Sequence, residues 1–206
     1  MELYEAIEKR RTVRDFTVKQ VPDEILTRIL DAGLKAPSHD HARDWHFVVV
    51  RRPERITEIL RHVSGGADVQ MDIINHWDTA TECQKSMYYD ALPKQVKMLS
   101  QSQCLVLPLF RAGAELTTPR DISSLNSFAS IWCLIQNMLL AATAEGLACS
   151  LRIPIRDEER YVLSCIHAPE GYRMPCYLAV GYASPSAKVI QQPPVSVADR
   201  IHPENW

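Results

Sequence analysis

The sequence predicts a globular protein of mixed helices and strands, and three features support this. The runs His46–Arg51 and Gln103–Phe110 are rich in apolar and β-branched residues, which is typical of strands. The stretch Leu125–Ala142 is apolar around most of a helical circumference, which predicts a buried helix in a domain centre or a subunit interface. A chain of 206 residues with 46% hydrophobic content can bury one large core or two small ones, and we treat residues 1–206 as one domain.

The first half of the chain offers helices separated by one strand. Leu3 and Ile7 lie one helical turn apart, which predicts a short amphipathic helix over residues 1–8. Pro22 followed by two acids is typical of a first helical turn, and the helix that begins there should end before Pro37. A polar loop, 36–45, then leads into the strand 46–51, and the remaining helices of this half are expected at 53–62, 79–91 and 94–100.

The second half should contain three strands and two helices. Pro108 argues against the strand 103–110, because proline cannot donate a hydrogen bond to the ladder. Ser123 or Ser124 can cap the long helix, and Gly146 can end it. The other elements are expected as strands at 148–153 and 175–182, a helix at 157–165 and an extended tail at 183–206. This proline-containing tail cannot fold on itself, so we expect it to wrap a neighbour.

A basic stretch follows the first helix. Lys9-Arg10-Arg11-Thr12-Val13-Arg14 concentrates positive charge in a chain whose formal net charge is −2. In extended form it would point Arg10, Thr12 and Arg14 to one side and Arg11 and Val13 to the other. Guanidinium groups bind oxyanions bidentately, so this side suits a phosphate. The alternative is a solvated cluster that offsets the dipole of the preceding helix.

Composition excludes several classes of function. The near-zero net charge gives no support for nucleic-acid binding. No run of 18 apolar residues exists, so we expect no membrane span, and the charged N-terminus argues against a secretory signal. Scattered cysteines without a C-x-x-C pair indicate reduced thiols in a cytoplasmic protein, with Cys149 as a buried structural thiol. We expect no metal site, because His39, His41 and His46 lack a carboxylate or cysteine in ligand spacing.

Three stretches of the chain between Leu3 and Tyr182 match the motifs of one known family. Arg10-Arg11-Thr12-Val13-Arg14 resembles the family's opening Arg-Arg-Ser-x-Arg. Ala36-Pro37-Ser38, followed by Trp45 and a β-branched strand, resembles Ala-Pro-Ser-x-x-Asn-x-Gln-Pro-Trp. Asn137–Ala142 with Gly146-Leu147 resembles the central helix and its exit. Each motif is weak alone, but their shared order and spacing are specific. On these motifs the chain from Leu3 to Tyr182 resembles the nitroreductase family of FMN-dependent oxidoreductases.

This resemblance implies an α+β fold with a central mixed or antiparallel sheet flanked by helices. It also implies an intertwined homodimer with one FMN in each of two interface sites. It assigns Arg10 and Arg11 to the FMN phosphate and ribityl, with Thr12 beside them, and Arg14 to the pyrimidine. From the other subunit it assigns Pro37, Ser38, His39 and His41 to the cofactor. The backbone N–H groups of Leu151-Arg152-Ile153 would face the flavin. Asp68 or Gln70 could also reach the pyrimidine.

Several residues depart from the family pattern. His41, Arg43 and Asp44 replace the Asn, Gln and Pro of the second motif, and Ile153-Pro154 replaces a Gly-Gly pair. Gln191 and Gln192 stand near the expected phosphate-binding Arg or Lys of the tail, with Lys188 as a substitute. These changes fall on the pocket, so they bear on the substrate rather than on the fold.

The resemblance implies hydride transfer from NAD(P)H through flavin N5 to a nitroaromatic, quinone or similar acceptor. A shared site for both substrates predicts ping-pong kinetics, and the chemistry would be the cofactor's, without a catalytic side chain. The alternatives are a flavin-binding relative with other chemistry, such as flavin fragmentation, dehalogenation or ene reduction, and a flavin-free binding protein. Expected partners are NAD(P)H, a small acceptor and a second copy of the chain.

Overall fold

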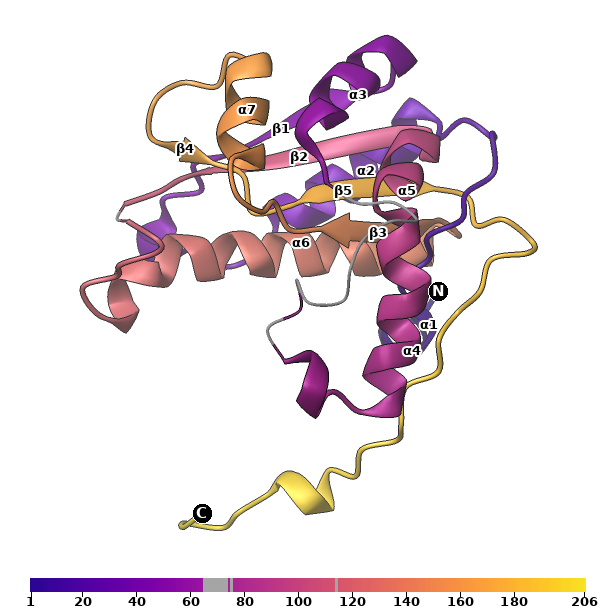
Figure 1. Cartoon of the computed structure of the whole chain (residues 1–206). Helices are drawn as coiled ribbons and strands as arrows, with labels where there is room; N and C mark the ends of the chain where they lie inside the picture. Colours follow the sequence, from indigo (N-terminus) through magenta and orange to yellow (C-terminus); the bar gives the residue numbers. More distant parts are fainter. Residues whose placement is uncertain (65–73, 75, 114) are drawn as a thin grey trace.

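A computed structural model describes residues 1–64, 74, 76–113 and 115–206. Asp68 and Gln70, which the resemblance brings toward the flavin, lie outside the described residues. Helices and strands follow one another along the chain much as the sequence predicts (Figure 1).

A sheet of antiparallel strands forms the centre of the fold. Its strands are β1 (Trp45–Val50), β2 (Cys104–Arg111), β3 (Ala148–Arg152), β4 (Tyr172–Arg173) and β5 (Tyr177–Gly181). They run in the order β1-β2-β5-β3, and β4 extends the β5 side of β2. One parallel bridge joins Thr12, which lies outside these strands, to Cys149 of β3. The predicted α+β class is confirmed.

Pro108 lies inside β2, and the pairing explains why the strand tolerates it. The Arg111 N–H donates to the Asp44 carbonyl at 3.2 Å, so alternate residues of β2 bond to β1 and Pro108 is not one of them. On its other side β2 pairs with β5 up to Val106 and with β4 from Phe110. Pro108 thus faces the gap between β4 and β5, where no ladder hydrogen bond is required.

Helices cover both faces of the sheet (Figure 1). α2 (Asp23–Leu34) and α6 (Asn126–Ala144) share one apolar core with Cys104, Val106 and Phe110 of β2. α3 (Pro53–Ile59), α5 (Gln95–Gln101) and α7 (Glu158–Cys165) share the other core with the alternate residues Leu105, Leu107 and Leu109. This division follows from the alternation of side chains along a strand.

Short helices complete the chain. α1 (Leu3–Lys9) contacts α6, and α4 (Glu82–Ala91) precedes α5. Single 3-10 turns lie at His39–His41, Leu60–His62, Trp77–Thr79, Leu92–Lys94, Ile122–Leu125 and Ala198–Arg200. The predicted cap of the long helix is wrong, because Asp121 caps the 3-10 turn before α6 and Ser124 is its capping-box partner. Gly146 ends α6 as predicted, in the left-handed conformation with φ of 76°.

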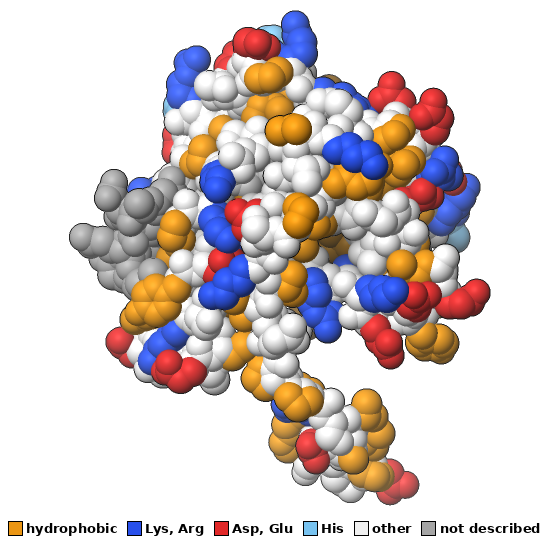
Figure 2. Space-filling model, turned by 90° about the vertical axis from the view of Figure 1, so that its right-hand side faces the viewer, with side chains coloured by type: hydrophobic (Ala, Val, Ile, Leu, Met, Phe, Trp, Pro, Cys, Tyr) orange, Lys and Arg blue, Asp and Glu red, His pale blue; other side chains and the backbone are white. Residues whose placement is uncertain are grey.

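Apolar surface is left open on this single chain. Leu3 and Ile7, the predicted apolar face of α1, are 60% and 47% exposed. By length and composition alone, the helical stretch Ile122–Ala144 could cross a membrane, with a mean hydropathy of 1.4, but α6 packs on the sheet as a core helix. The tail extends away from the body (Figure 2), and Trp206 at its end is fully exposed. These surfaces are available to a second copy of the chain, and the homodimer stays a prediction.

Candidate functional site

The N-terminal basic stretch borders a cavity of about 170 Å³, here called the arginine pocket. Its lining residues come from three segments: Arg10, Arg11, Thr12 and Arg14 from the stretch, Cys83, Gln84 and Met87 from α4, and Val189, Ile190 and Gln192 from the tail. The stretch is extended as predicted, and the Val13 N–H donates to the Cys149 carbonyl at 3.0 Å. This bond fixes the arginines against the start of β3.

Two of the arginines carry positive charge without an acidic partner in the part of the chain that the structure describes. Neither Arg10 nor Arg11 forms an ion pair with a described residue. The predicted direction of Arg11 is wrong, because its guanidinium turns back and donates to the Glu8 carbonyl at 2.7 Å. That carbonyl belongs to the last turn of α1, where unsatisfied acceptors attract a cation. Arg11 therefore joins Arg10 at the same pocket, while Val13 is buried.

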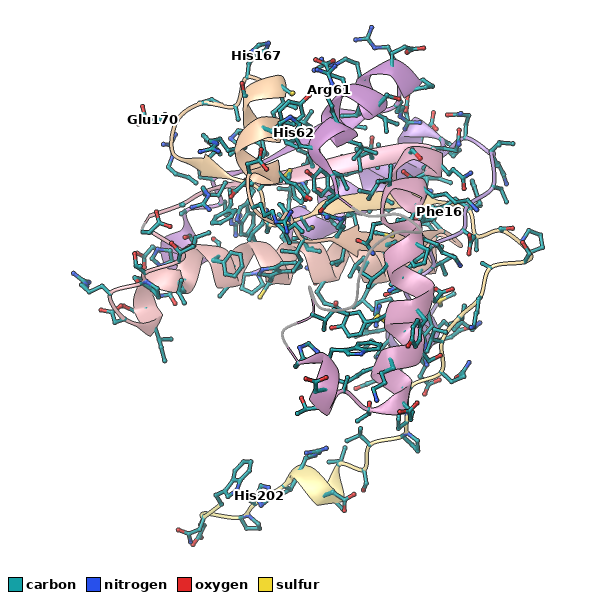
Figure 3. All side chains as sticks on the ribbon, in the orientation of Figure 1. Phe16, Arg61, His62, His167, Glu170 and His202 are labelled. Atoms are coloured by element: carbon teal, nitrogen blue, oxygen red, sulfur yellow. The ribbon has the colours of Figure 1, made fainter. Side chains whose placement is uncertain are left out.

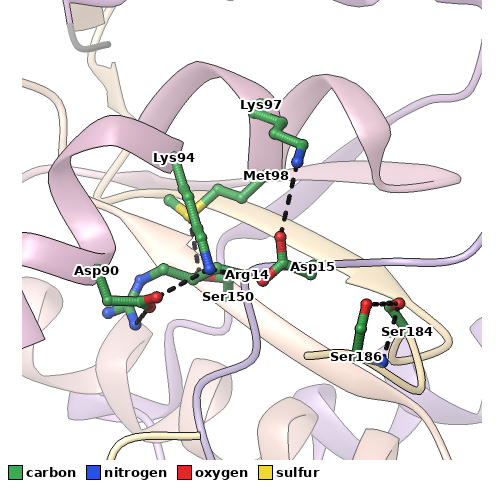
Figure 4. A network of polar contacts seen from close by, with 9 residues as sticks. All are labelled: Arg14, Asp15, Asp90, Lys94, Lys97, Met98, Ser150, Ser184 and Ser186. Carbon is green, nitrogen blue, oxygen red and sulfur yellow. Dashed lines mark hydrogen bonds and ion pairs between the residues drawn. The ribbon is translucent and has the colours of Figure 1, made fainter. Parts of the chain in front are cut away.

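Arg14 belongs to an ionic network with α4 and α5 (Figure 4). Its guanidinium lies 3.5 Å from Asp90, which also accepts from Lys94 at 2.8 Å. Lys94 bonds to Asp15 at 2.7 Å as well, so the network ties the basic stretch to the helices. Burial lowers the pKa of Arg14, while the charge of Asp90 opposes this shift. Arg14 is thus a partly compensated cation.

The second motif borders another cavity, of about 220 Å³, here called the Ser38 pocket. The Ser38 hydroxyl oxygen is buried and has no hydrogen-bond partner among the described residues. The His39 N–H donates to the Ser130 hydroxyl at 3.0 Å, which fastens the motif to the first turns of α6. Ser38 and His39 line this pocket, whereas the exposed Pro37 and His41 do not.

The loop around this pocket has an unusual backbone. Asp40, His41 and Arg43 have φ values of 49°, 52° and 47°. Left-handed backbone costs free energy in residues other than glycine, and such strain clusters at ligand sites. The backbone of this loop is therefore typical of a ligand-binding segment.

The two pockets lie at opposite ends of α6. Ser130, near the start of the helix, holds the second motif, whereas the arginine pocket adjoins Cys149, just beyond the C-terminal end of the helix. A helix rises 1.5 Å per residue, so Ser130 and Ala144 are about 21 Å apart. The predicted cofactor residues therefore form two separate groups within one chain.

The remaining predicted cofactor residues, at the exit of β3, lie away from both pockets. Leu151, Arg152 and Ile153 line neither pocket. The Arg152 side chain turns inward to an ion pair with Glu158, and it also donates to the Ser64 carbonyl at 2.9 Å. Arg152 is 7% exposed and Glu158 1% exposed, so the pair is buried. Its role here is to fix the strand exit, and a cofactor contact could come only from its backbone.

The sequence reasoning did not identify the α4 residues of the arginine pocket. Cys83, Gln84 and Met87 fall in a segment that matches no motif of the resemblance. The capping box Thr81-x-x-Gln84 indicates where α4 begins, but no local pattern indicates that this helix borders a pocket. In the tail, Gln192 lines the pocket as the resemblance suggests, and the Gln191 carbonyl accepts from the Cys83 thiol at 3.3 Å. Lys188 lines a neighbouring cavity instead.

Comparisons with known proteins agree with this architecture. A "Putative NADH dehydrogenase/NAD(P)H nitroreductase" of Methanothermobacter thermautotrophicus is 42% identical over 59 residues, which are 29% of this chain and 31% of that protein. Iodotyrosine deiodinase 1 of Pongo abelii is 26% identical over 195 residues, covering 91% of this chain and 63% of that protein. The chain thus matches less than two thirds of the length of either relative.

Solved structures share the fold. Oxidized iodotyrosine deiodinase bound to FMN and 3-iodo-L-tyrosine superposes with a TM-score of 0.76 at 21% identity, over 100% of both chains. A nitroreductase-like family protein from Bacillus cereus gives 0.68 at 18% identity, over 98% of this chain and 95% of the other. The profile described as "Nitroreductase family" matches residues 7–182. With most of its length matched, this chain belongs to the nitroreductase family.

Proposed function

We propose that the protein is an FMN-dependent oxidoreductase that takes hydride from NAD(P)H and reduces a small organic acceptor. The observation that carries this proposal is the arginine pocket, where Arg10 and Arg11 have no acidic partner among the described residues. Two such guanidiniums at one cavity suit the phosphate of FMN. When bound, FMN would supply the hydride chemistry itself.

The residues of this chain then have distinct roles. Arg10 and Arg11 bind the phosphate, with the Thr12 hydroxyl beside them. Arg14 lies close enough to the same cavity to favour negative charge on the flavin ring, although Asp90 offsets part of its field. The partnerless Ser38 hydroxyl is a polar group that a ligand could satisfy.

The separation of the two pockets supports a site shared between two subunits. Within one chain, about 21 Å of α6 separates the segment that carries the Ser38 pocket from the segment that carries the arginine pocket, so the two groups of predicted cofactor residues do not meet at one cavity. A homodimer in which the Ser38 pocket of one subunit meets the arginine pocket of the other would unite them. The open apolar surfaces of α1 and the tail favour such a partner.

Reductive dehalogenation is the second candidate reaction. It is favoured by the similarity to iodotyrosine deiodinase 1, which spans 91% of this chain. The two candidates share the cofactor and differ in the acceptor, so a panel of acceptors separates them. The test panel should pair a quinone and a nitroaromatic with 3-iodo-L-tyrosine.

The purified protein should be yellow with flavin absorbance. An initial-rate matrix of NADH or NADPH against a quinone should give parallel double-reciprocal lines, because one shared site makes the kinetics ping-pong. Intersecting lines would contradict the shared site. A colourless protein that does not bind added FMN would refute the proposal as a whole.

A further inference from the structure

The Ser38 pocket has a positive charge balance. Among its described lining residues are two arginines, Arg43 and Arg111, and a single carboxylate, Asp44. His39, also at the pocket, lies 3.3 Å from Asp40 and is balanced by that neighbour if it is protonated. Arg43 and Asp44 stand where the family motif has Gln and Pro; their charges cancel in the sum, and Arg111 supplies the excess positive charge.

Arg111 is oriented at the pocket wall by contacts with Asp44 and Tyr172. Its Nε donates to the Asp44 carboxylate at 2.7 Å, and its guanidinium carbon lies 4.7 Å from the centre of the Tyr172 ring. The Tyr172 hydroxyl donates to the other oxygen of Asp44 at 2.5 Å. These contacts fix the guanidinium plane and leave donors on its other nitrogens for a ligand. The hydrogen bond to Asp44 raises the pKa of Arg111, so it stays charged.

Arg43 is the second cation of this pocket, and no carboxylate of the described residues pairs with it. It is exposed. Its left-handed backbone, with φ of 47°, belongs to the strained loop 40–43. A guanidinium on a fixed wall and a second one on this loop could grip an anionic group from two sides.

The remaining lining residues define what the anion is attached to. Ala42, Trp45 and Ala112 offer apolar surface beside the two arginines. A volume of about 220 Å³ suits a single aromatic ring with its substituents. The pocket therefore combines a cationic wall with an apolar floor.

We propose that the Ser38 pocket selects aromatic acceptors that carry a carboxylate, with Arg43 and Arg111 as the side chains that recognise it. This inference rests on the proposed function, because the acceptor would occupy the same composite site as FMN. Recognition by Arg43 is a matter of specificity, and no proton or electron passes through it.

The test compares two acceptors that share the reducible group and the ring. The ratio of kcat/KM for 4-nitrobenzoate to that for 4-nitrobenzyl alcohol is measured in the FMN-loaded protein and in its Arg43→Gln variant. Loss of one charged hydrogen bond should lower the ratio about tenfold or more. Arg61→Gln is the matched control. It removes an exposed arginine beside α3 and α7, on the opposite face of the sheet from α6 (Figure 3), and should leave the ratio unchanged.

Binding without turnover gives an independent readout. Calorimetric titration of the FMN-loaded protein with benzoate and with benzyl alcohol should find tighter binding of benzoate, and Arg43→Gln should remove most of that preference. Equal binding of the two compounds, or a ratio of rates that Arg43→Gln does not change, would overturn the inference. If neither nitro compound is reduced but the Arg43-dependent preference for benzoate is found, the proposed function fails while the anion pocket stands.

Discussion

The buried ion pair at the exit of β3 gives the sharpest test of the fold. The change is Glu158→Gln, which keeps the size of the side chain and removes its charge. Glu158 accepts from both terminal nitrogens of Arg152, from the Ser64 N–H at 3.2 Å and from the Ile155 N–H at 3.2 Å. The Nε of Arg152 has no partner among the described residues, so its charge depends on Glu158.

The expected loss follows from this burial. Removing one partner of a buried pair leaves an uncompensated charge and costs roughly 3–5 kcal/mol in the free energy of unfolding. The double variant Arg152→Met/Glu158→Leu should recover much of this loss, because apolar residues of similar volume often replace a buried pair at little cost. The difference between the double variant and the sum of the single ones measures the coupling.

Urea unfolding, followed by fluorescence, provides the measurement. The control is Glu145→Gln, since Glu145 pairs with Arg28, whose side chain is 56% exposed and can be solvated when its partner is lost. A loss below about 1 kcal/mol for Glu158→Gln, at an unchanged m-value, would refute the reasoning that the pair is buried and isolated from water.

Three further changes test other parts of the structure. Arg10→Ala should weaken FMN binding by roughly 1.5–3 kcal/mol and Arg10→Lys should restore only part of it, measured by quenching of flavin fluorescence; equal affinities would remove Arg10 from the phosphate site. Asp90→Asn should raise the reduction potential of bound flavin, because the charge of Arg14 would be less compensated. The potential is measured by spectroelectrochemistry, and an unchanged or lower value would contradict the role of Arg14. Asp44→Asn tests a pH dependence, since the hydrogen bonds from Tyr172 and then Arg111 lower the pKa of Asp44. A carboxylate with a lowered pKa stabilises the fold above its ordinary pKa, near 4, so the stability difference between wild type and variant should be full at pH 7 and shrink as the pH falls below about 4. A stability difference between wild type and Asp44→Asn that grows as the pH falls would contradict a lowered pKa of Asp44.

Local patterns in the sequence predict many of the helices and strands. The β-branched run at 46–51 became β1, the apolar stretch became α6, and Pro37 follows the end of α2 as expected. These predictions hold because periodicity and helix stops act over a few residues. Pro108 seemed to break a strand, and only the positions of β4 and β5 explain why it does not.

The site depended on contacts that no local pattern encodes. Tyr172 reaches Asp44 across 128 positions of the chain, and Arg14 reaches Asp90 across 76. The sequence motifs identified Arg10 and Ser38 as candidates, but not the inward turn of Arg152, which requires its acidic partner on α7. The alternation of side chains along an extended segment did not predict the position of the Arg11 guanidinium, because this long side chain folds back onto α1.

The distance between the arginine pocket and the Ser38 pocket has a genetic consequence. In a homodimer whose sites each combine one pocket from either subunit, a chain damaged at Arg10 and a chain damaged at Ser38 form a mixed pair with both lesions in one site. The other site of that pair is then intact. Two alleles that are inactive alone should therefore complement each other when expressed together. Each mixed dimer would have up to half of the normal number of working sites. A site contained within one chain would allow no such rescue.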